Sequence, residues 1–423
     1  MKTYAEMKAA DSPWLDTMPA HWTLSRFRYE AVINGGQVDP RDEPWNGMTL
    51  IAPNHVESNT GRILGIETAQ EQGADSGKYL VEPGQLVYSK IRPALNKVVI
   101  AETQALCSAD MYAMSFTGRV EPRFALYYFL ARPFHTFATV ISMRVKMPKV
   151  NREELADAPW LMPPLEEQRA IADYLDRETA SIHTLIEEQQ RLIEMLRERR
   201  QDLIRVAVLG SENPFAPSAG AVFTAIGHHF SVSLGKMLDA GKVIRADDEM
   251  LPYIRAGNIQ DAGLSLNDVN EMPYSAAEAA NLNLLAGDLL VVEGGAVGTN
   301  VVIREDMPGW SFQKTANRLR PLDGWSSAWL GYVLRTYRDI GVIDIVCNKS
   351  TIPHLTAEKL RAMRVPSVPP DEQLRVTARL DQETAKIDTL MAETERFIEI
   401  VRERQSALIT AAVTGQIDVR EMA

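Results

Sequence analysis

The chain has few of the features that anchor a protein in a membrane or cross-link it. Its 423 residues include two cysteines, Cys107 and Cys347, too few for a disulfide framework and typical of a reducing compartment. No apolar run approaches the length of a membrane-spanning helix, and the first residues lack the apolar core of a secretion signal. We therefore predict a cytoplasmic protein that has no membrane partner.

Motifs for catalysis and metal binding are also scarce. The seven histidines and two cysteines show no zinc-ligand spacing. The segment 294–298 is rich in glycine but precedes a strand-like run, which favours a hairpin turn over a phosphate-binding loop. Asn213-Pro214-Phe215 lacks the second proline of an amino-methyltransferase loop. We predict no catalytic residue, no metal site and no cofactor in this chain.

Positive charge is in deficit over the whole chain, whose formal net charge is −11, but its distribution is uneven. Residues 85–150 carry nine Lys or Arg against three Asp or Glu, and residues 301–365 carry ten against six. Binding to phosphate depends on local positive surface rather than on the sum over the chain. These two segments are candidates for contact with DNA, and scattered solvated charges are the alternative.

What the chain does have is an internal repeat, 205 residues apart. The segment from Pro164 to Gly210 aligns without a gap with the segment from Pro369 to Gly415, and many positions are identical, including Gln168 and Gln373. A repeat of this length indicates a duplicated structural unit. Each copy begins within a Pro-Pro pair, Pro163-Pro164 or Pro369-Pro370, and acidic residues follow, which is typical of the first turn of a helix.

The segments before the two copies are less alike but share one pattern. Strands are predicted at 48–52, 85–88 and 97–101 in the first, and at 285–292 and 300–303 in the second. A helix is predicted to follow in each, at 122–130 and 326–334. Whole halves are therefore duplicated, and the parts before the repeats have diverged further. This suits one scaffold that carries two different specificities.

Each repeat contains heptad-spaced apolar residues, which predict helices that pair. The predicted contact residues are Ile182, Leu185, Leu192, Leu196, Leu203, Ile387, Leu390, Phe397, Val401 and Leu408. Because the chain between the helices must return, we expect an antiparallel pair. A helix of about 32 residues would span roughly 48 Å, more than the roughly 34–36 Å of one turn of DNA. The alternative is an ordinary helical hairpin that packs the two domains together and whose length is unrelated to DNA.

These residues resemble the specificity subunit of type I restriction–modification systems. The resemblance rests on the Pro163–Gln168 block and its second copy at Pro369–Gln373, each followed by a long helix. The segments Trp14–Trp22 and Ala411–Asp418 also resemble the ends of such subunits, so the likeness runs over nearly the full length.

The resemblance implies an α+β fold with two α/β target-recognition domains joined by two long helices, which form an antiparallel coiled coil with pseudo-twofold symmetry. The implied domains are target-recognition domain 1 (1–162), spacer helix 1 (163–210), a linker (211–220), target-recognition domain 2 (221–367), spacer helix 2 (368–415) and a tail (416–423).

The implied partners are double-stranded DNA with a split target, two methyltransferase subunits and restriction translocase–nuclease subunits. S-adenosylmethionine is expected in the methyltransferase partner, which methylates adenine N6, and not in this chain.

The basic segments supply the candidate DNA-binding residues, because Arg and Asn can read base edges and Lys mostly holds phosphate. They are Lys90, Arg92, Lys97, Arg144, Lys146, Lys149, Lys314, Arg318, Arg320, Asn348, Lys349, Ser350 and Thr351. The sequence does not tell base contacts from phosphate contacts. A second hypothesis is a protein–protein scaffold in which the repeated helices organise a complex and the basic surfaces have no role in DNA binding.

Overall fold

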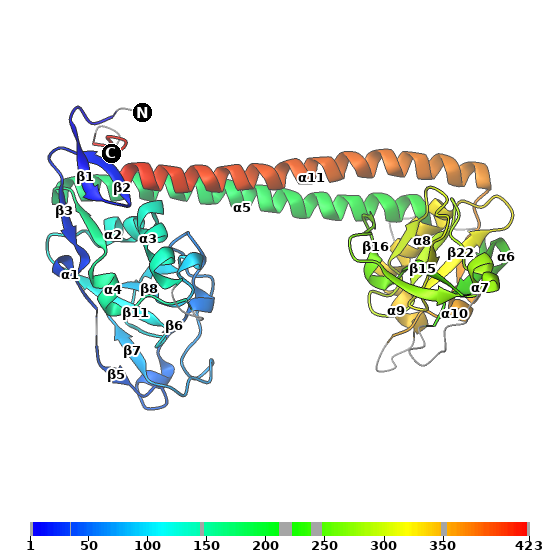
Figure 1. Cartoon of the computed structure of the whole chain (residues 1–423), viewed down its shortest axis with the longest axis horizontal. Coiled ribbons are helices and arrows are strands. Elements are labelled where there is room, and N and C mark those ends of the chain that lie inside the picture. The colour runs from blue at the N-terminus through cyan, green and yellow to red at the C-terminus, as the bar shows by residue number, and fades with distance from the viewer. Residues whose placement is uncertain are drawn as a thin grey trace. The chain divides into compact units, whose positions relative to one another are not determined.

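The computed structural model describes residues 3–33, 35–143, 148–210, 222–237, 248–347 and 353–420. The chain divides into two compact units. Unit 1 comprises Met1–Gln190 and Thr394–Ala423, and unit 2 comprises Arg191–Glu393. Each unit contains a body of strands and short helices and part of two long helices, α5 (Leu165–Leu209) and α11 (Pro370–Val413) (Figure 1). Helices and sheets occur together, which confirms the α+β class.

The two long helices begin where the sequence predicts, at the Pro-Pro pairs: α5 starts directly after Pro164, and Pro370 is the first residue of α11. Each has two acidic residues in its first turn, Glu166 and Glu167 in α5 and Asp371 and Glu372 in α11, where they interact favourably with the helix dipole. The helices have 45 and 44 residues. They exceed the predicted length of about 32 residues because the apolar heptads begin several turns inside each helix.

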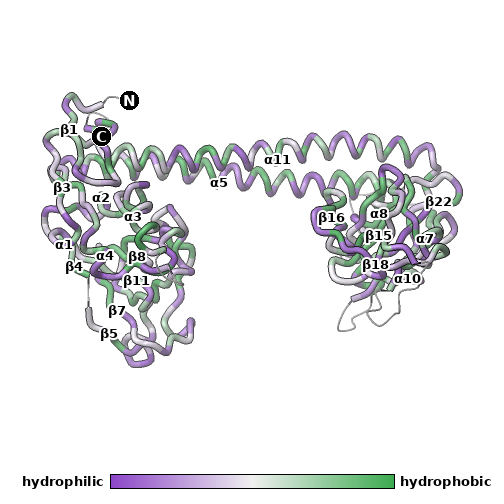
Figure 2. The backbone as a smooth tube through the Cα atoms, in the orientation of Figure 1, coloured by the Kyte–Doolittle hydropathy of each residue, from purple (hydrophilic) through white to green (hydrophobic). Residues whose placement is uncertain are grey.

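Within each unit the two long helices run antiparallel. In unit 1 the side chains of Gln405 and His183 are hydrogen-bonded, with 2.9 Å between their Nε2 atoms. In unit 2 the guanidinium of Arg200 pairs with Asp388, Nε to Oδ1 at 2.8 Å. Apolar residues recur along both helices (Figure 2). The antiparallel prediction is therefore confirmed in each unit.

The buried stripe of α11 differs in part from the predicted one. It advances in alternating steps of four and three residues, and Ile398 and Val401 on it are 6% and 7% exposed. Leu390 and Phe397 lie beside this stripe and are 43% and 42% exposed, so they are not part of the buried stripe, and their role as contact residues stays a prediction. Most of the predicted residues are partly or fully buried: Ile182, Leu185, Leu192, Leu196, Leu203, Ile387, Val401 and Leu408.

The body of unit 1 contains two four-stranded sheets. One has the order β4-β11-β8-β9, with all neighbours antiparallel. Its strands are Ala31–Ile33, Met111–Phe116, Leu86–Ser89 and Val98–Ile100. The other has the order β5-β7-β10-β6, with strands Gln37–Val38, Lys78–Val81, Ala105–Cys107 and Leu50–Ile51. Helix α2 (Pro122–Leu130) packs on β8 and β9.

Shorter elements complete unit 1. They are α1 (Phe27–Glu30), α3 (Arg132–Ser142), α4 (Arg152–Ala156), the hairpin β1 (Met7–Ser12) and β2 (Leu15–Pro19), and the pair β3 (Thr23–Arg26) and β12 (Pro159–Met162). One continuous apolar core joins the body to the long helices, because Phe124 and Trp160 belong to the same cluster as Ile171 of α5 and Ala412 of α11.

The body of unit 2 repeats this plan. Its antiparallel sheet has the order β14-β22-β19-β20, with strands Phe230–Leu234, Ala316–Pro321, Leu289–Val292 and Asn300–Val302. Helix α8 (Ser327–Asp339) packs on it as α2 packs on the sheet of unit 1. The same order and direction of strands in both bodies confirm that whole halves are duplicated.

The remaining elements of unit 2 form a second sheet and short connections. The second sheet has the order β18-β15-β21, with strands Asn270–Tyr274, Glu249–Ile254 and Ser311–Phe312. The others are β13 (Phe223–Ala225), β16 (Ile259–Gln260), β17 (Gly263–Leu264), β23 (Arg364–Pro366), α6 (Ile226–His229), α7 (Ala276–Asn281), α9 (Val342–Cys347) and α10 (Ala357–Ala362).

Both ends of the described chain pack together in unit 1. Glu167, 6% exposed in the first turn of α5, accepts a hydrogen bond from Tyr4 and pairs with His21, Nε2 to Oε2 at 2.8 Å. Gly415 follows α11 with a φ of +70°, close against Pro19. Among the described residues, no helix has both the length and the apolarity that crossing a membrane requires.

Candidate nucleic-acid interface

Each body is attached to its own long helix by one buried glutamine. Gln168, fully buried in the first turn of α5, accepts a hydrogen bond from the backbone N–H of Glu121 at 2.9 Å. Its amide donates to the carbonyls of Arg119 and Pro163, both at 2.9 Å. The amide side chain thus satisfies backbone groups at the start of α2 that burial would otherwise leave unpaired.

The second copy repeats this attachment. Gln373 accepts from the backbone N–H of Ser326 at 2.9 Å and donates to the carbonyl of Val368 at 2.7 Å. Six residues further along α2 and α8, Tyr127 donates to Asp176 at 2.7 Å and Tyr332 donates to Asp381 at 2.6 Å. Burial raises the pKa of Tyr332 to about 12, so its hydroxyl keeps the proton that it donates. We call these contacts the anchor of each unit.

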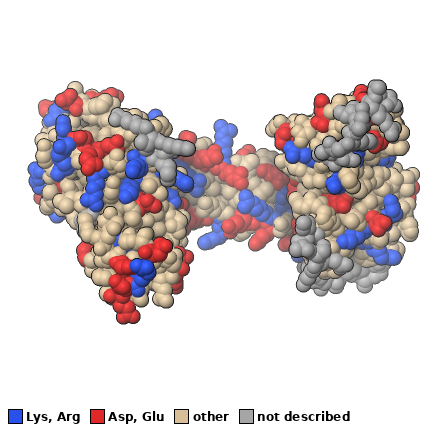
Figure 3. Space-filling model, turned by 60° about the horizontal axis from the view of Figure 1, so that its bottom comes forward, with Lys and Arg blue, Asp and Glu red and all other residues tan. Residues whose placement is uncertain are grey.

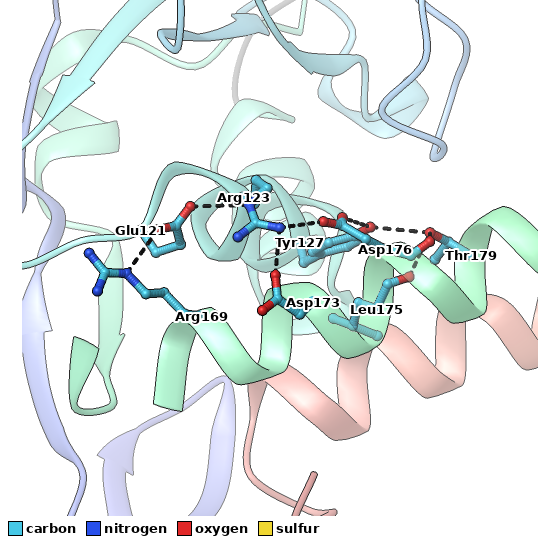
Figure 4. A network of polar contacts seen from close by, with 8 residues as sticks. All are labelled: Glu121, Arg123, Tyr127, Arg169, Asp173, Leu175, Asp176 and Thr179. Carbon is cyan, nitrogen blue, oxygen red and sulfur yellow. Dashed lines mark hydrogen bonds and ion pairs between the residues drawn. The ribbon is translucent and has the colours of Figure 1, made fainter. Parts of the chain in front are cut away.

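Unit 1 adds an ion-pair network to its anchor (Figure 4). Arg123 reaches Asp173 and Asp176 of α5, in both cases with 2.7 Å between Nη1 and a carboxylate oxygen, and its Nε lies 3.2 Å from Glu121. The equivalent positions of unit 2 hold Ala328 and Ala378 in place of Arg123 and Asp173. The repeated contacts are therefore the glutamine and the tyrosine, and the network is specific to unit 1.

The positive surface of unit 1 includes a cluster around the ring of Tyr112. Lys90 Nζ lies 5.3 Å from the ring centroid and the guanidinium carbon of Arg152 lies 5.7 Å from it. Arg92 and Lys149 are exposed and adjacent, because the backbone N–H of Arg92 bonds to the carbonyl of Pro148 and Ile91 pairs with Lys149. Figure 3 shows Lys and Arg gathered in several patches on this unit.

Three of the predicted DNA-binding residues, Lys90, Arg92 and Lys149, thus come together from segments about 60 residues apart. Arg152 belongs to this basic cluster and was missed, although its position three residues after Lys149 in a basic segment could have pointed to it. Arg144, Lys146, Asn348, Lys349, Ser350 and Thr351 lie outside the described residues.

Lys97 lies apart from the basic cluster. Its Nζ donates to the carbonyl of Pro53 at 2.5 Å. It lines a cleft of about 920 Å³ together with Arg62, His183 and Arg402. Arg62 crosses this cleft to Glu187 of α5, with 2.9 Å between Nη1 and Oε1. The pKa of His183 is lowered, mainly by burial and also by the positive charge of Arg62. Acidic and basic residues balance along the cleft walls, so it lacks the excess positive charge that phosphate requires.

Two predicted residues of unit 2 have structural roles instead. Arg318 is 5% exposed and donates to the carbonyl of Asn283 at 2.5 Å. Burial lowers the pKa of Arg318. Arg320 forms a two-pronged ion pair with Asp288, which is 1% exposed, with both N–O distances at 2.7 Å. The burial of Arg318 does not fit a contact with DNA, whereas Arg320 has a side chain that is 29% exposed, so its contact with DNA stays a prediction. Lys314 is exposed.

One polar arrangement in unit 2 resembles a nucleophile and its base. Thr224 Oγ1 lies 3.2 Å from His229 Nε2, and His229 Nδ1 lies 2.7 Å from Asp323 Oδ2. The imidazole lies flat on the ring of Trp325, with centroids 3.9 Å apart. The same corner of unit 1 is closed by the ion pair of Glu30 with Arg119, so we assign both arrangements a structural role. Among the described residues, no group of three or more His, Cys, Asp or Glu is placed to hold a metal ion.

The repeated plan and the anchors define a duplicated α+β protein with long connecting helices as the class to compare, and unit 1 carries a basic cluster that is suited to phosphate. Residues 32–195 match the model of the family described as the type I restriction modification DNA specificity domain. A type I restriction enzyme specificity subunit, EcoDI from Escherichia coli, is 32% identical over 207 residues. This alignment covers 47% of the chain and 46% of that relative, so the chain matches about half the length of its curated relative.

Two solved structures share the fold. A chain from a study of complex assembly and conformational transition in the type I restriction–modification system aligns with a TM-score of 0.76 and 18% identity, covering 95% of this chain and 99% of that one. The HsdS subunit from Thermoanaerobacter tengcongensis aligns with a TM-score of 0.56 and 17% identity, covering 95% and 98%. Residues 32–195 are thus similar to this family's domain, and the two solved structures show that the fold of the chain is that of such subunits.

Proposed function

We propose that this chain is the DNA-specificity subunit of a type I restriction–modification system. Each unit reads one half of a split, asymmetric target, and the long helices carry the two readers. The observation that supports this most directly is the duplicated anchor, in which Gln168 and Gln373 attach two bodies of one topology to equivalent helices. Conserved attachment with divergent bodies is what two half-sites of different sequence require.

The chain itself is proposed to be non-catalytic. Two methyltransferase subunits would supply S-adenosylmethionine and methylate adenine N6, and restriction translocase–nuclease subunits would cleave DNA. The contribution of this chain is to bind and orient. The basic cluster would hold the phosphate backbone, and phosphate contacts fix the position of a protein on the duplex without reading its sequence.

The first test is to map methylated adenines in DNA from cells that carry this chain with its neighbouring methyltransferase. We expect one bipartite sequence, methylated in both halves, and its loss when the gene for this chain is deleted. Methylation that persists unchanged after the deletion would overturn the proposal.

The second test measures binding of the purified full chain, with its methyltransferase partner, to that duplex as the salt concentration is raised. Replacing Arg92 and Lys149 by alanine should weaken binding to all duplexes and lower the slope of log K against log salt by roughly two, about one for each phosphate that is no longer neutralised. Arg41→Ala is the matched control, because Arg41 is an exposed arginine of unit 1 that pairs with Asp39 outside the basic cluster. If the chain is only a scaffold, the double variant and the control will behave as the wild type does.

A further inference from the structure

The two bodies contain the same backbone crossing at the end of a central strand, and they place opposite charges there. In unit 1 the N–H of Val150 donates to the carbonyl of Lys90 at 2.9 Å. In unit 2 the N–H of Leu355 donates to the carbonyl of Glu293 at 2.8 Å. Because Lys90 follows β8 and Glu293 follows β19, which hold the same place in their sheets, the two residues are structural equivalents.

A second contact confirms this equivalence. The hydroxyl of Tyr112 donates to the carbonyl of Val150 at 3.2 Å, and the amide of Asn317 donates to the carbonyl of Leu355 at 3.0 Å. Tyr112 and Asn317 are the second residues of β11 and β22. The crossing is thus held by a side chain from the neighbouring strand in both units, and the backbone frame around Lys90 and Glu293 is shared.

The surroundings of the two side chains differ as their charges do. Lys90 belongs to the basic cluster of unit 1. Glu293 is partly buried, and its carboxylate accepts a hydrogen bond from Asn317 that is long, 3.4 Å from Nδ2 to Oε2. Burial raises the pKa of Glu293, and the exposed His354 and Lys314 close by offset this only in part. The long hydrogen bond from Asn317 is therefore weak and leaves the carboxylate able to accept another hydrogen bond.

A carboxylate at this place cannot hold DNA phosphate, because like charges repel and a carboxylate has no donor. On a surface that meets DNA, it is favourable only where it accepts a hydrogen bond from a base. In the major groove the exocyclic amino groups of cytosine and adenine are the donors, and Glu is a known acceptor from cytosine N4. A lysine at the equivalent place can donate to guanine or thymine oxygens or hold phosphate.

We infer that Glu293 is a base-reading residue of unit 2, which accepts a hydrogen bond from the exocyclic amino group of a cytosine or adenine in the major groove. This inference rests on the proposed function and adds to it a specificity-determining position. It also implies that the half-sites read by the two units differ in hydrogen-bond polarity at the equivalent position.

The test is selection from a duplex library of random sequence by the full chain with its methyltransferase partner, for the wild type and for Glu293→Lys and Glu293→Gln. The wild type should select a bipartite sequence with cytosine or adenine at one position of one half-site. Glu293→Lys should lose that preference and bind the wild-type sequence roughly ten- to hundredfold more weakly, with the other half-site unchanged. Glu293→Gln, whose amide both donates and accepts, should relax the preference at the same position.

Glu305→Lys is the matched control, since it makes the same charge change at an exposed position of unit 2 and should select the wild-type sequence. The half-site read by unit 1 reports in the same experiment whether each variant is folded. If Glu293→Lys does not fold, Glu293→Gln decides the question. A wild type that selects no bipartite sequence refutes the proposed function, whereas a wild type that does, with both variants of Glu293 selecting the same sequence at equal affinity, refutes only the role of Glu293.

Discussion

Replacing Gln168 by alanine should loosen unit 1 and leave unit 2 intact. The side chain is fully buried and makes three hydrogen bonds to backbone groups. At about 1 kcal/mol for each bond, the substitution should cost about 3 kcal/mol. Gln373 makes two such bonds, so Gln373→Ala should cost about 2 kcal/mol and affect unit 2 instead.

Native-state hydrogen exchange suits this prediction, because a chain with two compact units need not unfold in one step. Amides of α2 should exchange about a hundredfold faster in Gln168→Ala than in the wild type, and amides of α8 should be unaffected. Gln373→Ala should show the opposite pattern, and each variant is therefore the control for the other. Equal loss of protection in both units, or no loss in either, would contradict the assignment of these glutamines as anchors.

Two further predictions concern stability. Gly415→Ala should destabilise unit 1 by about 2 kcal/mol or more, because a Cβ at this position would lie 2.3 Å from Pro19 Cδ and the residue has a φ of +70°. Proteolysis should then cut the β1–β2 hairpin faster than in the wild type. An unchanged rate of cleavage would count against this packing. Glu293→Gln should be at least as stable as the wild type near neutral pH. Burial raises the pKa of Glu293, so folding favours the protonated form, and that stability is lost as the pH rises through the raised pKa. Thermal melting at about pH 7 and about pH 4 should show the advantage of glutamine only at the higher pH; an advantage that persists in acid would refute this cause.

The local sequence predicted most elements well, because their boundaries depend on neighbouring residues. Helix α2 spans Pro122–Leu130 as predicted, and β8, β9, β19 and β20 lie within or beside their predicted ranges. Proline at the first helical position and glycine at turns act within a few residues. The repeat then extended each local prediction to its second copy.

The structure departs from the predictions where the outcome depends on which side of a helix or strand is covered by neighbouring elements. Leucines and isoleucines occur on more than one side of each long helix, so the heptad pattern allowed Leu390 and Phe397 to be placed in the seam. In the same way, Arg318 was placed among the DNA-binding candidates because it lies in a basic segment, whereas its side chain is buried. Only the tertiary packing decides such cases.

The anchors show the reverse case, in which a signal was present without an interpretation. Gln168 and Gln373 are identical in the two copies, and so are Glu167 and Glu372. The glutamines have one role in both units, but Glu167 is buried by Tyr4 and His21 while Glu372 is exposed. Identity of sequence in a repeat therefore does not establish identity of role.

The anchors place few sequence requirements on the bodies that they attach to the long helices. From each body, they need a backbone N–H before the helix, which any residue except proline provides, and a tyrosine six residues later. Beyond these groups, the attachment constrains only the apolar residues of the body that pack against the long helices, such as Phe124 and Trp329. An exchange of one body for another of the same topology that retains these apolar residues would preserve the joint, so that recombination between genes would replace a whole body in one step without a redesign of the helices.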